Sequence, residues 1–112
     1  MNRSLTVRIN GSVYTVPFRE IVLMENELRK IRLQQVNGEK LFYSTFAQVM
    51  EQLDDRFMQC SRSYILNMDH IRAMRQQGQH EVIMDNGRHI PLSKKCFLRA
   101  KNIFEDYLER NR

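Results

Sequence analysis

The fold is decided by Leu5-Thr6-Val7-Arg8-Ile9-Asn10-Gly11-Ser12-Val13-Tyr14-Thr15-Val16, in which two strand-like runs flank an Asn-Gly pair. Leu5, Val7 and Ile9 alternate with polar residues, which is the period of a half-buried β-strand. Asn-Gly supplies the two positive φ angles that a two-residue hairpin turn needs. The stretch therefore predicts an antiparallel β-hairpin.

The same turn signal recurs along the chain, at Asn37-Gly38 and at Asn86-Gly87, and Gly78 lies in a further polar break. Apolar or alternating runs of strand length lie beside and between these turns, at 21–24, 30–34, 40–43, 64–66, 82–84 and 89–92. Strands of this length joined by glycine-containing turns are typical of antiparallel sheets. The chain is therefore predicted to be a mostly β domain of about eight to ten short, hairpin-connected strands.

Two segments have the pattern of short helices. Thr45-Phe46-Ala47-Gln48 is a capping box, and it opens an apolar stripe that continues through Val49, Met50 and Leu53. Ser93 is a good N-cap for a second helix, on which Cys96, Ala100, Ile103 and Tyr107 share one face. Residues 109–112 are expected to fray at its end. We expect residues 1–112 to form one domain.

Composition indicates an ordinary folded protein. Hydrophobic residues make up 42% and charged residues 28% of the 112 residues, which is enough to bury a core and is unlike a disordered chain. No apolar run approaches the roughly 20 residues that span a bilayer, and the N-terminus lacks a signal peptide. We therefore expect a cytoplasmic protein that does not contact membranes.

The residues that most often carry catalysis or bind metal are scattered. His70, His80 and His89 have no partner at zinc-ligand spacing, and Asp54-Asp55 lies between a predicted helix and a strand, as a polar turn does. Cys60 and Cys96 form no Cys-x-x-Cys pattern and are expected to be reduced thiols without a disulfide. We expect no enzyme activity, no metal, no cofactor and no small-molecule substrate.

Three basic segments fall at the edges of predicted elements: Glu27-Leu28-Arg29-Lys30-Ile31-Arg32, Ser61-Arg62-Ser63 and Ser93-Lys94-Lys95. The net charge of +5 is concentrated at the two ends of the chain. Residues 1–40 carry seven Lys/Arg against four Asp/Glu, and residues 94–112 carry six against three, whereas residues 41–93 have a net charge of −1. A fold that brings the two ends together would create one basic face.

The third segment has a physical reason to bind an anion. A helix N-terminus is the positive end of the helix dipole, so lysines in the first turn are mildly unfavourable there. Lys94 and Lys95 are better explained if an anion sits at this terminus and accepts from the free backbone N–H groups. Arg62, in turn, interrupts one of the most apolar stretches of the chain. Both features favour a functional role for these residues, with an anion as the ligand at the helix start, over an ordinary solvated surface.

Taken in order, these pieces resemble the LytTR family, the DNA-binding domain of LytR/AlgR-type bacterial response regulators. The resemblance covers nearly the whole chain. It rests on Ile21-Val22-Leu23-Met24-Glu25, Leu53-Asp54-Asp55-Arg56-Phe57, Cys60-Ser61-Arg62-Ser63-Tyr64-Ile65-Leu66-Asn67 with Ile71, Asp85-Asn86-Gly87, and Ile90-Pro91-Leu92-Ser93 with the lysines that follow. One departure is Ser61, which stands where the family commonly has His.

The resemblance implies short antiparallel sheets packed side by side with small helices. It also implies that loops enter successive major grooves of bent, double-stranded DNA, in the output domain of a two-component response regulator that controls transcription. The family's contact positions map to the stretch around Arg29, Lys30 and Ile31, to Arg62, and to Lys94 and Lys95. The family domain usually follows a receiver domain, and nothing in residues 1–112 resembles one.

The predicted DNA-binding residues are therefore Arg29, Lys30, Ile31, Arg32, Ser61, Arg62, Ser63, Ser93, Lys94 and Lys95. Arg62 is expected to contact a guanine edge, and the lysines at the helix start to hold phosphates. The expected partner is double-stranded DNA at repeated promoter sites, with binding as a homodimer left open. Two alternatives remain from the residues alone: a protein-interaction or dimerisation module with a basic face, and a small RNA-binding domain.

Overall fold

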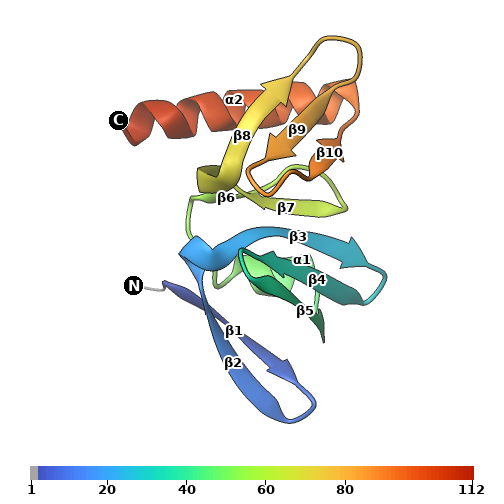
Figure 1. Ribbon diagram of the computed structural model, residues 1–112, viewed down its shortest axis with the longest axis vertical. Helices are drawn as coiled ribbons and strands as arrows, with labels where there is room; N and C mark the ends of the chain where they lie inside the picture. Colours follow the sequence, from blue (N-terminus) through green and yellow to red (C-terminus); the bar gives the residue numbers. More distant parts are fainter. Residues whose placement is uncertain (1–2) are drawn as a thin grey trace.

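Three antiparallel sheets follow one another along the long axis of the computed structural model, which describes residues 3–112 (Figure 1). Residues 1 and 2 of the expected domain lie outside the described residues. The strands are β1 (Ser4–Ile9), β2 (Ser12–Pro17), β3 (Ile21–Glu27), β4 (Lys30–Gln35), β5 (Gly38–Tyr43), β6 (Phe57–Gln59), β7 (Tyr64–Asn67), β8 (Ile71–Arg75), β9 (Glu81–Met84) and β10 (His89–Pro91). The α-helices are α1 (Phe46–Met50) and α2 (Lys94–Arg110), and two 3-10 turns, η1 (Phe18–Glu20) and η2 (Met68–His70), precede β3 and β8.

The central sheet has five strands in the order β5-β4-β3-β7-β6. The hairpin β1-β2 lies at one end of the molecule, and the sheet β10-β9-β8 with α2 lies at the other (Figure 1). The predicted mostly β fold of short antiparallel sheets with two helices is confirmed. The helices differ in size from the expectation, however, because α2 has 17 residues and only α1 is short.

The Asn-Gly pairs mark hairpins, but only the first forms the expected two-residue turn. There, Ile9 pairs with Ser12, and Asn10 and Gly11 have φ of 50° and 82°. In the second hairpin Gln35 pairs with Gly38, so the turn residues are 36 and 37, one position earlier than predicted. The third connection is a longer loop between β9 and β10, in which Gly87 has φ of 91°. Each Asn-Gly pair therefore predicted the place of a turn, but not which residues form the turn.

The five-stranded sheet separates two hydrophobic cores, because successive side chains of a strand point to opposite faces. On one face, residues from β3, β4, β5, β6 and β7 pack against β1, β2 and α1: Met24, Ile31, Leu33, Phe42, Phe57 and Ile65 against Leu5, Val7, Val16, Phe46 and Val49. On the other face, β3, β6 and β7 pack against β9, β10 and α2: Leu23, Met58 and Leu66 against Val82, Met84, Ile90, Ala100 and Tyr107. The sheet is therefore the layer that both ends of the chain share.

Helix α1 begins as predicted. Thr45 Oγ1 accepts from the backbone N–H of Gln48, and the Gln48 side chain in turn accepts from the backbone N–H of Thr45, which completes the capping box. The helix ends at Met50, so Leu53 packs on the first core from beyond its last turn.

Helix α2 begins after Ser93, whose Oγ accepts from the backbone N–H of Cys96 at 3.2 Å. The predicted N-cap is therefore confirmed. The expected fraying of residues 109–112 is wrong for the first two of them, because the helix continues through Arg110. The Arg110 guanidinium donates to Asp55 at 3.1 Å and lies 3.7 Å from the Asp106 carboxylate, which holds the last turn against the segment before β6.

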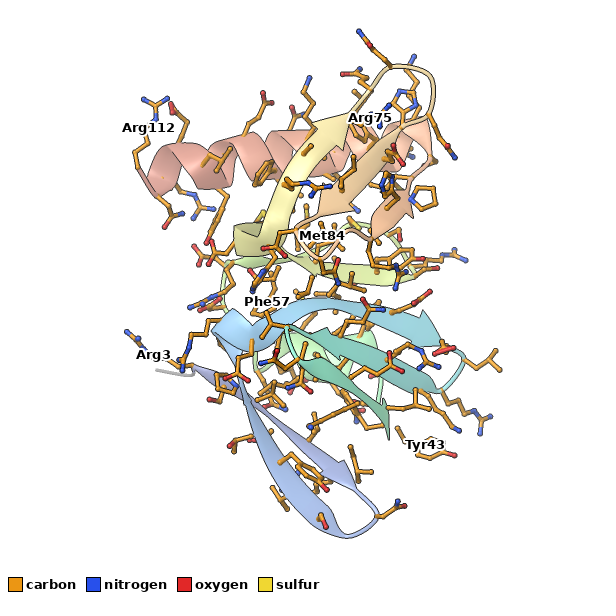
Figure 2. The ribbon with its side chains drawn as sticks, in the orientation of Figure 1. Arg3, Tyr43, Phe57, Arg75, Met84 and Arg112 are labelled. Atoms are coloured by element: carbon orange, nitrogen blue, oxygen red, sulfur yellow. The ribbon has the colours of Figure 1, made fainter. Side chains whose placement is uncertain are left out.

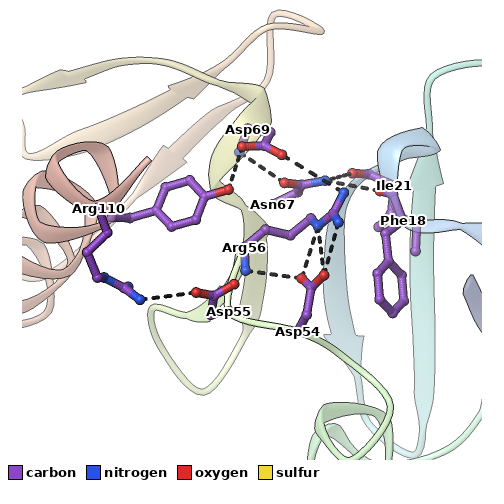
Figure 3. A network of polar contacts seen from close by, with 9 residues as sticks. Phe18, Ile21, Asp54, Asp55, Arg56, Asn67, Asp69 and Arg110 are labelled. Atoms are coloured by element: carbon purple, nitrogen blue, oxygen red, sulfur yellow. Dashed lines mark hydrogen bonds and ion pairs between the residues drawn. The ribbon is translucent and has the colours of Figure 1, made fainter. Parts of the chain in front are cut away.

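A polar network joins the two ends of the molecule where the cores approach each other (Figure 3). The buried Asn67 amide donates to the carbonyl oxygens of Phe18 and Ile21 at 3.1 and 2.8 Å. Beside it, Arg56 makes a two-pronged contact with Asp54 at 3.0 Å, and its guanidinium lies over the Phe18 ring, 5.4 Å from the centroid. Because these groups are satisfied inside the fold, they hold η1 and the segment before β6 in a fixed relation.

Cys60 and Cys96 are both free thiols. Cys60 is buried in the second core, and burial raises the pKa of its thiol to about 12.

No helix within residues 3–112 is long and apolar enough to cross a membrane.

Candidate nucleic-acid interface

Three segments lie along one side of the molecule: the β3–β4 turn, the β6–β7 loop and the start of α2 (the right-hand side in Figure 1). We call this the basic side, and we define it by the cations that these segments carry: Arg29, Lys30, Arg62, Lys94 and Lys95. The three predicted basic segments are therefore brought together, although they are separated by about 30 residues each along the chain.

The β3–β4 turn has two residues, because Glu27 pairs with Lys30. The side chains of Leu28 and Arg29 are exposed, and Leu28 is 96% exposed. Lys30 opens β4, and its ammonium group lies 5.1 Å from the centroid of the Tyr43 ring on the neighbouring strand. The turn residues and the side chains of Lys30 and Tyr43 surround a hollow of about 690 Å³.

Two predicted contact residues on β4 have other partners. Ile31 is 0% exposed in the first core, so its side chain is not available to DNA and we remove it from the candidate site. Arg32 lies between two carboxylates, with 2.6 Å from Nε to Glu27 and 2.6 Å from Nη1 to Glu39. The hydrogen bond from Arg32 lowers the pKa of Glu27, and the pair of carboxylates neutralises the arginine.

The β6–β7 loop, residues 60–63, is held from the β3 side by Asn26. The Asn26 backbone N–H donates to the Ser63 carbonyl at 2.9 Å, and its side-chain amide donates to the Arg62 carbonyl at 3.5 Å. Within the loop, Ser61 Oγ accepts from the backbone N–H of Ser63 at 3.2 Å. These contacts use the main chain around Arg62 and leave the Arg62 side chain exposed at the loop tip.

The start of α2 lies on the other flank of the same loop. Arg99 donates from Nη2 to the carbonyl oxygens of Gln59 and Cys60 at 3.3 and 3.1 Å. Between the loop and the helix is a hollow of about 410 Å³ that Arg62 and Cys96 help to line. Ser93 caps the N–H of Cys96, and among residues 3–112 no side chain caps the N–H groups of Lys94 and Lys95, which also lack a partner within the helix.

The cations of the basic side differ from Arg32 in their pairing. Among residues 3–112, the side chains of Arg29, Arg62, Lys94 and Lys95 make no hydrogen bond or ion pair, and Lys30 has no carboxylate within 4.0 Å. Five positive charges are thus presented to solvent from three segments. The basic side covers only part of the molecule's 45 Å longest axis, because the β1–β2 hairpin extends beyond the β3–β4 turn (Figure 1).

Figure 2 shows the side chains on the ribbon, with Tyr43 near the basic side and Arg112 at the opposite end of α2.

Sequence reasoning missed Asn26 and Arg99, which hold the Arg62 loop from its two flanks. No sequence pattern near either residue could predict these contacts, because they join distant segments. Asn26 and Ser63 are 37 residues apart, and Arg99 and Cys60 are 39 residues apart. It also missed Leu28, which lies within a predicted segment but was not assigned a contact.

The comparison with family models decides the family. The model of the LytTr DNA-binding domain matches residues 11–105, which include all three segments of the basic side. The chain belongs to the LytTR family. The resemblance inferred from the sequence is therefore confirmed, and DNA is the partner of this LytTR domain.

A solved structure from Bacillus cereus, the LytTr DNA-binding domain of a protein described as a methyl-accepting/DNA response regulator, is similar to the LytTR domain. The TM-score is 0.76 over 92% of this chain and 97% of that chain, with 22% sequence identity. At this identity the likeness establishes the shared fold. No curated protein matches the chain. Among residues 3–112 no group of three or more His, Cys, Asp or Glu side chains could hold a metal ion.

Proposed function

We propose that this LytTR domain binds double-stranded DNA by sequence to regulate transcription, as the output domain of a two-component response regulator. The observation that carries the proposal is the set of unpaired cations from three distant segments on one side of the molecule. In this proposal the loops of the basic side enter successive major grooves, as the family resemblance implies.

Arg62 contacts a base edge in this proposal. Its main chain is fixed by Asn26, while its side chain projects from a loop tip without a carboxylate partner. The planar guanidinium can donate two parallel hydrogen bonds to guanine O6 and N7, which is the commonest specific contact in the major groove. Ser61 and Ser63 flank it, and in this proposal Ser61 either contacts a phosphate or gives a base preference different from that of the family's usual His.

Lys94 and Lys95 hold a phosphate together with the helix start. Both residues lie in the first turn of α2, where the backbone N–H groups are uncapped and the helix dipole favours an anion. Ser93 completes this end by capping Cys96. At the other end of the basic side, Arg29 and Lys30 contact phosphates and bases beside the β3–β4 turn, whereas Arg32 acts only through its ion pairs. The proposal also includes that the DNA targets are repeated sites in promoters. It leaves open whether the domain binds them as a homodimer.

A salt titration tests this function. Duplexes enriched from a random DNA pool, an RNA duplex of the same sequence and a random DNA duplex are compared by equilibrium binding between about 50 and 200 mM salt. Roughly five phosphate contacts predict a slope of log K against log salt near −4.5 for the enriched duplex, at about −0.9 per contact. A flat salt response would favour a protein partner, and preference for the RNA duplex would favour an RNA-binding domain; either result contradicts the proposal.

A further inference from the structure

Leu28 is in an unusual position for a leucine. It is the first residue of the two-residue β3–β4 turn, and 96% of its side chain is exposed, more than for any other large apolar residue within the described chain. A single exposed leucine on a protein surface needs no explanation. Its backbone is the second observation, because φ of Leu28 is 60°, in the left-handed region.

A leucine with positive φ is disfavoured by contact of its Cβ with the backbone. In residues 3–112, every other positive φ belongs to a glycine or to Asn10, which are the residues that tolerate this region. Within its turn only Leu28 has a positive φ, which is the pattern of a type II′ hairpin turn. The first position of that turn favours glycine. A glycine there would relax the backbone, so the leucine side chain is present at a cost to the turn.

The surroundings of Leu28 indicate what its side chain contacts. Arg29 and Lys30 follow it directly, and the turn belongs to the basic side that faces DNA in the proposed function. A groove of duplex DNA offers one apolar group that depends on sequence, the 5-methyl group of thymine in the major groove. We infer that Leu28 is a specificity residue that packs against a thymine methyl group, while Arg29 and Lys30 hold the neighbouring phosphates. This inference rests on the proposed function.

The test removes the two apolar partners in turn. A duplex enriched from a random pool by the wild-type domain is resynthesised with deoxyuridine in place of each thymidine, one position at a time. Uracil lacks only the methyl group and keeps the same hydrogen-bonding edge. The loss of one buried methyl-sized contact predicts that wild type binds about fourfold more weakly when the critical thymine is replaced.

Leu28→Gly is the matching protein variant. It should bind the thymine duplex about tenfold more weakly than wild type, because the whole side chain is lost, and it should not distinguish thymine from uracil. Because glycine suits the positive φ, the unfolding temperature should be unchanged or higher, which separates the loss of binding from a loss of fold.

Val36→Gly is the control. Val36 is also an exposed apolar turn residue, at 49%, but it lies in the β4–β5 turn at the opposite end of β4. This variant should keep wild-type affinity and wild-type sensitivity to uracil.

Several results would overturn the inference. It fails alone if a duplex is enriched but uracil is tolerated at every position, or if Leu28→Gly keeps the uracil sensitivity. It also fails if Leu28→Gly changes the sedimentation of the free domain and leaves DNA affinity intact, because Leu28 would then contact a second copy. If no duplex is enriched at all, the proposed function fails first and this inference fails with it.

Discussion

Arg99 on α2 donates from Nη2 to the carbonyl oxygen of Cys60 at 3.1 Å, across 39 residues of sequence. The same nitrogen lies 3.3 Å from the Gln59 carbonyl. These bonds hold the loop that carries Arg62 on its α2 flank, as Asn26 holds it on the β3 flank. In the proposed complex, the position of the Arg62 side chain therefore depends on residues that need not touch the DNA.

Arg99→Met should weaken discrimination between an enriched duplex and a random one, because the loop around Arg62 loses one of its two supports. We expect a loss of about 1 kcal/mol, the net value of a hydrogen bond of this kind. Arg99→Lys is the control for charge, since it keeps the cation without the guanidinium geometry. If Arg99→Lys restores both affinity and discrimination, Arg99 acts as a charge near phosphate and not by positioning the loop.

Lys94→Ala and Lys95→Ala should each weaken binding to enriched and random duplexes to a similar degree. Each should reduce the slope of log K against log salt by about one, as expected for the loss of a phosphate contact. Thermal unfolding should show unchanged or slightly higher stability, because both lysines oppose the helix dipole. Lys95 also lies where the family resemblance allows a base contact, so a selective loss on the enriched duplex would reassign Lys95.

Arg56→Met should destabilise the fold by about 1–3 kcal/mol, because the partly buried Asp54 carboxylate would lose its two-pronged partner. The Arg112–Glu109 pair, at 2.7 Å with both side chains exposed, supplies the comparison. Arg112→Met should cost less than about 1 kcal/mol, which is the usual range for an exposed ion pair. Chemical denaturation measures the free energy of unfolding of both variants. Equal losses would show that the network in Figure 3 stabilises the fold no more than an exposed ion pair does.

The Cys60 thiol should be unreactive in the folded protein. Burial raises its pKa to about 12, so at pH 8 it is protonated as well as inaccessible. A thiol-specific reagent at pH 8 should therefore modify Cys96, which is partly exposed, and reach Cys60 only after unfolding. Rapid modification of both thiols in the native state would contradict the burial of Cys60.

The raised pKa of Cys60 also predicts a loss of stability in base. Below pH 9 the thiol is protonated in both states, and between pH 9 and 12 it ionises in the unfolded chain but not in the folded one. The free energy of unfolding should therefore fall as pH rises through this range, by up to about 1.4 kcal/mol per pH unit. In Cys60→Ala this part of the decline should be absent, whatever the variant's stability at pH 8.

Local patterns were sufficient where a contact partner lies close in the sequence. Asn10-Gly11 specifies its own turn, and Thr45 and Gln48 specify the start of α1. Arg29 and Arg32, by contrast, look alike in the sequence. Strand pairing decides between them, because it brings Glu39 of β5 beside Arg32 and leaves Arg29 in a turn.

The same reasoning explains the other two differences. Ile31 was assigned to the contact segment with its neighbours, but the two-residue period of β4 points it into the core. The turn at Leu28 had no signal, because leucine is not a turn residue and the turn is visible only from the pairing of β3 with β4.

The central claim is that Arg62 contacts a base within a specific complex, and Arg62→Ala compared with Arg112→Ala tests it most directly. Arg112 is a charge-matched control at the far end of α2 (Figure 2), and its ion pair with Glu109 is an exposed one. Arg110, which carries the same charge near the same end of α2, is unsuitable as a control because it holds α2 to Asp55. Arg62→Ala should cost roughly 1–3 kcal/mol on the enriched duplex and little on random DNA, while Arg112→Ala changes neither. If both variants lose the same affinity on both duplexes, binding is diffuse electrostatics and the specific site does not exist.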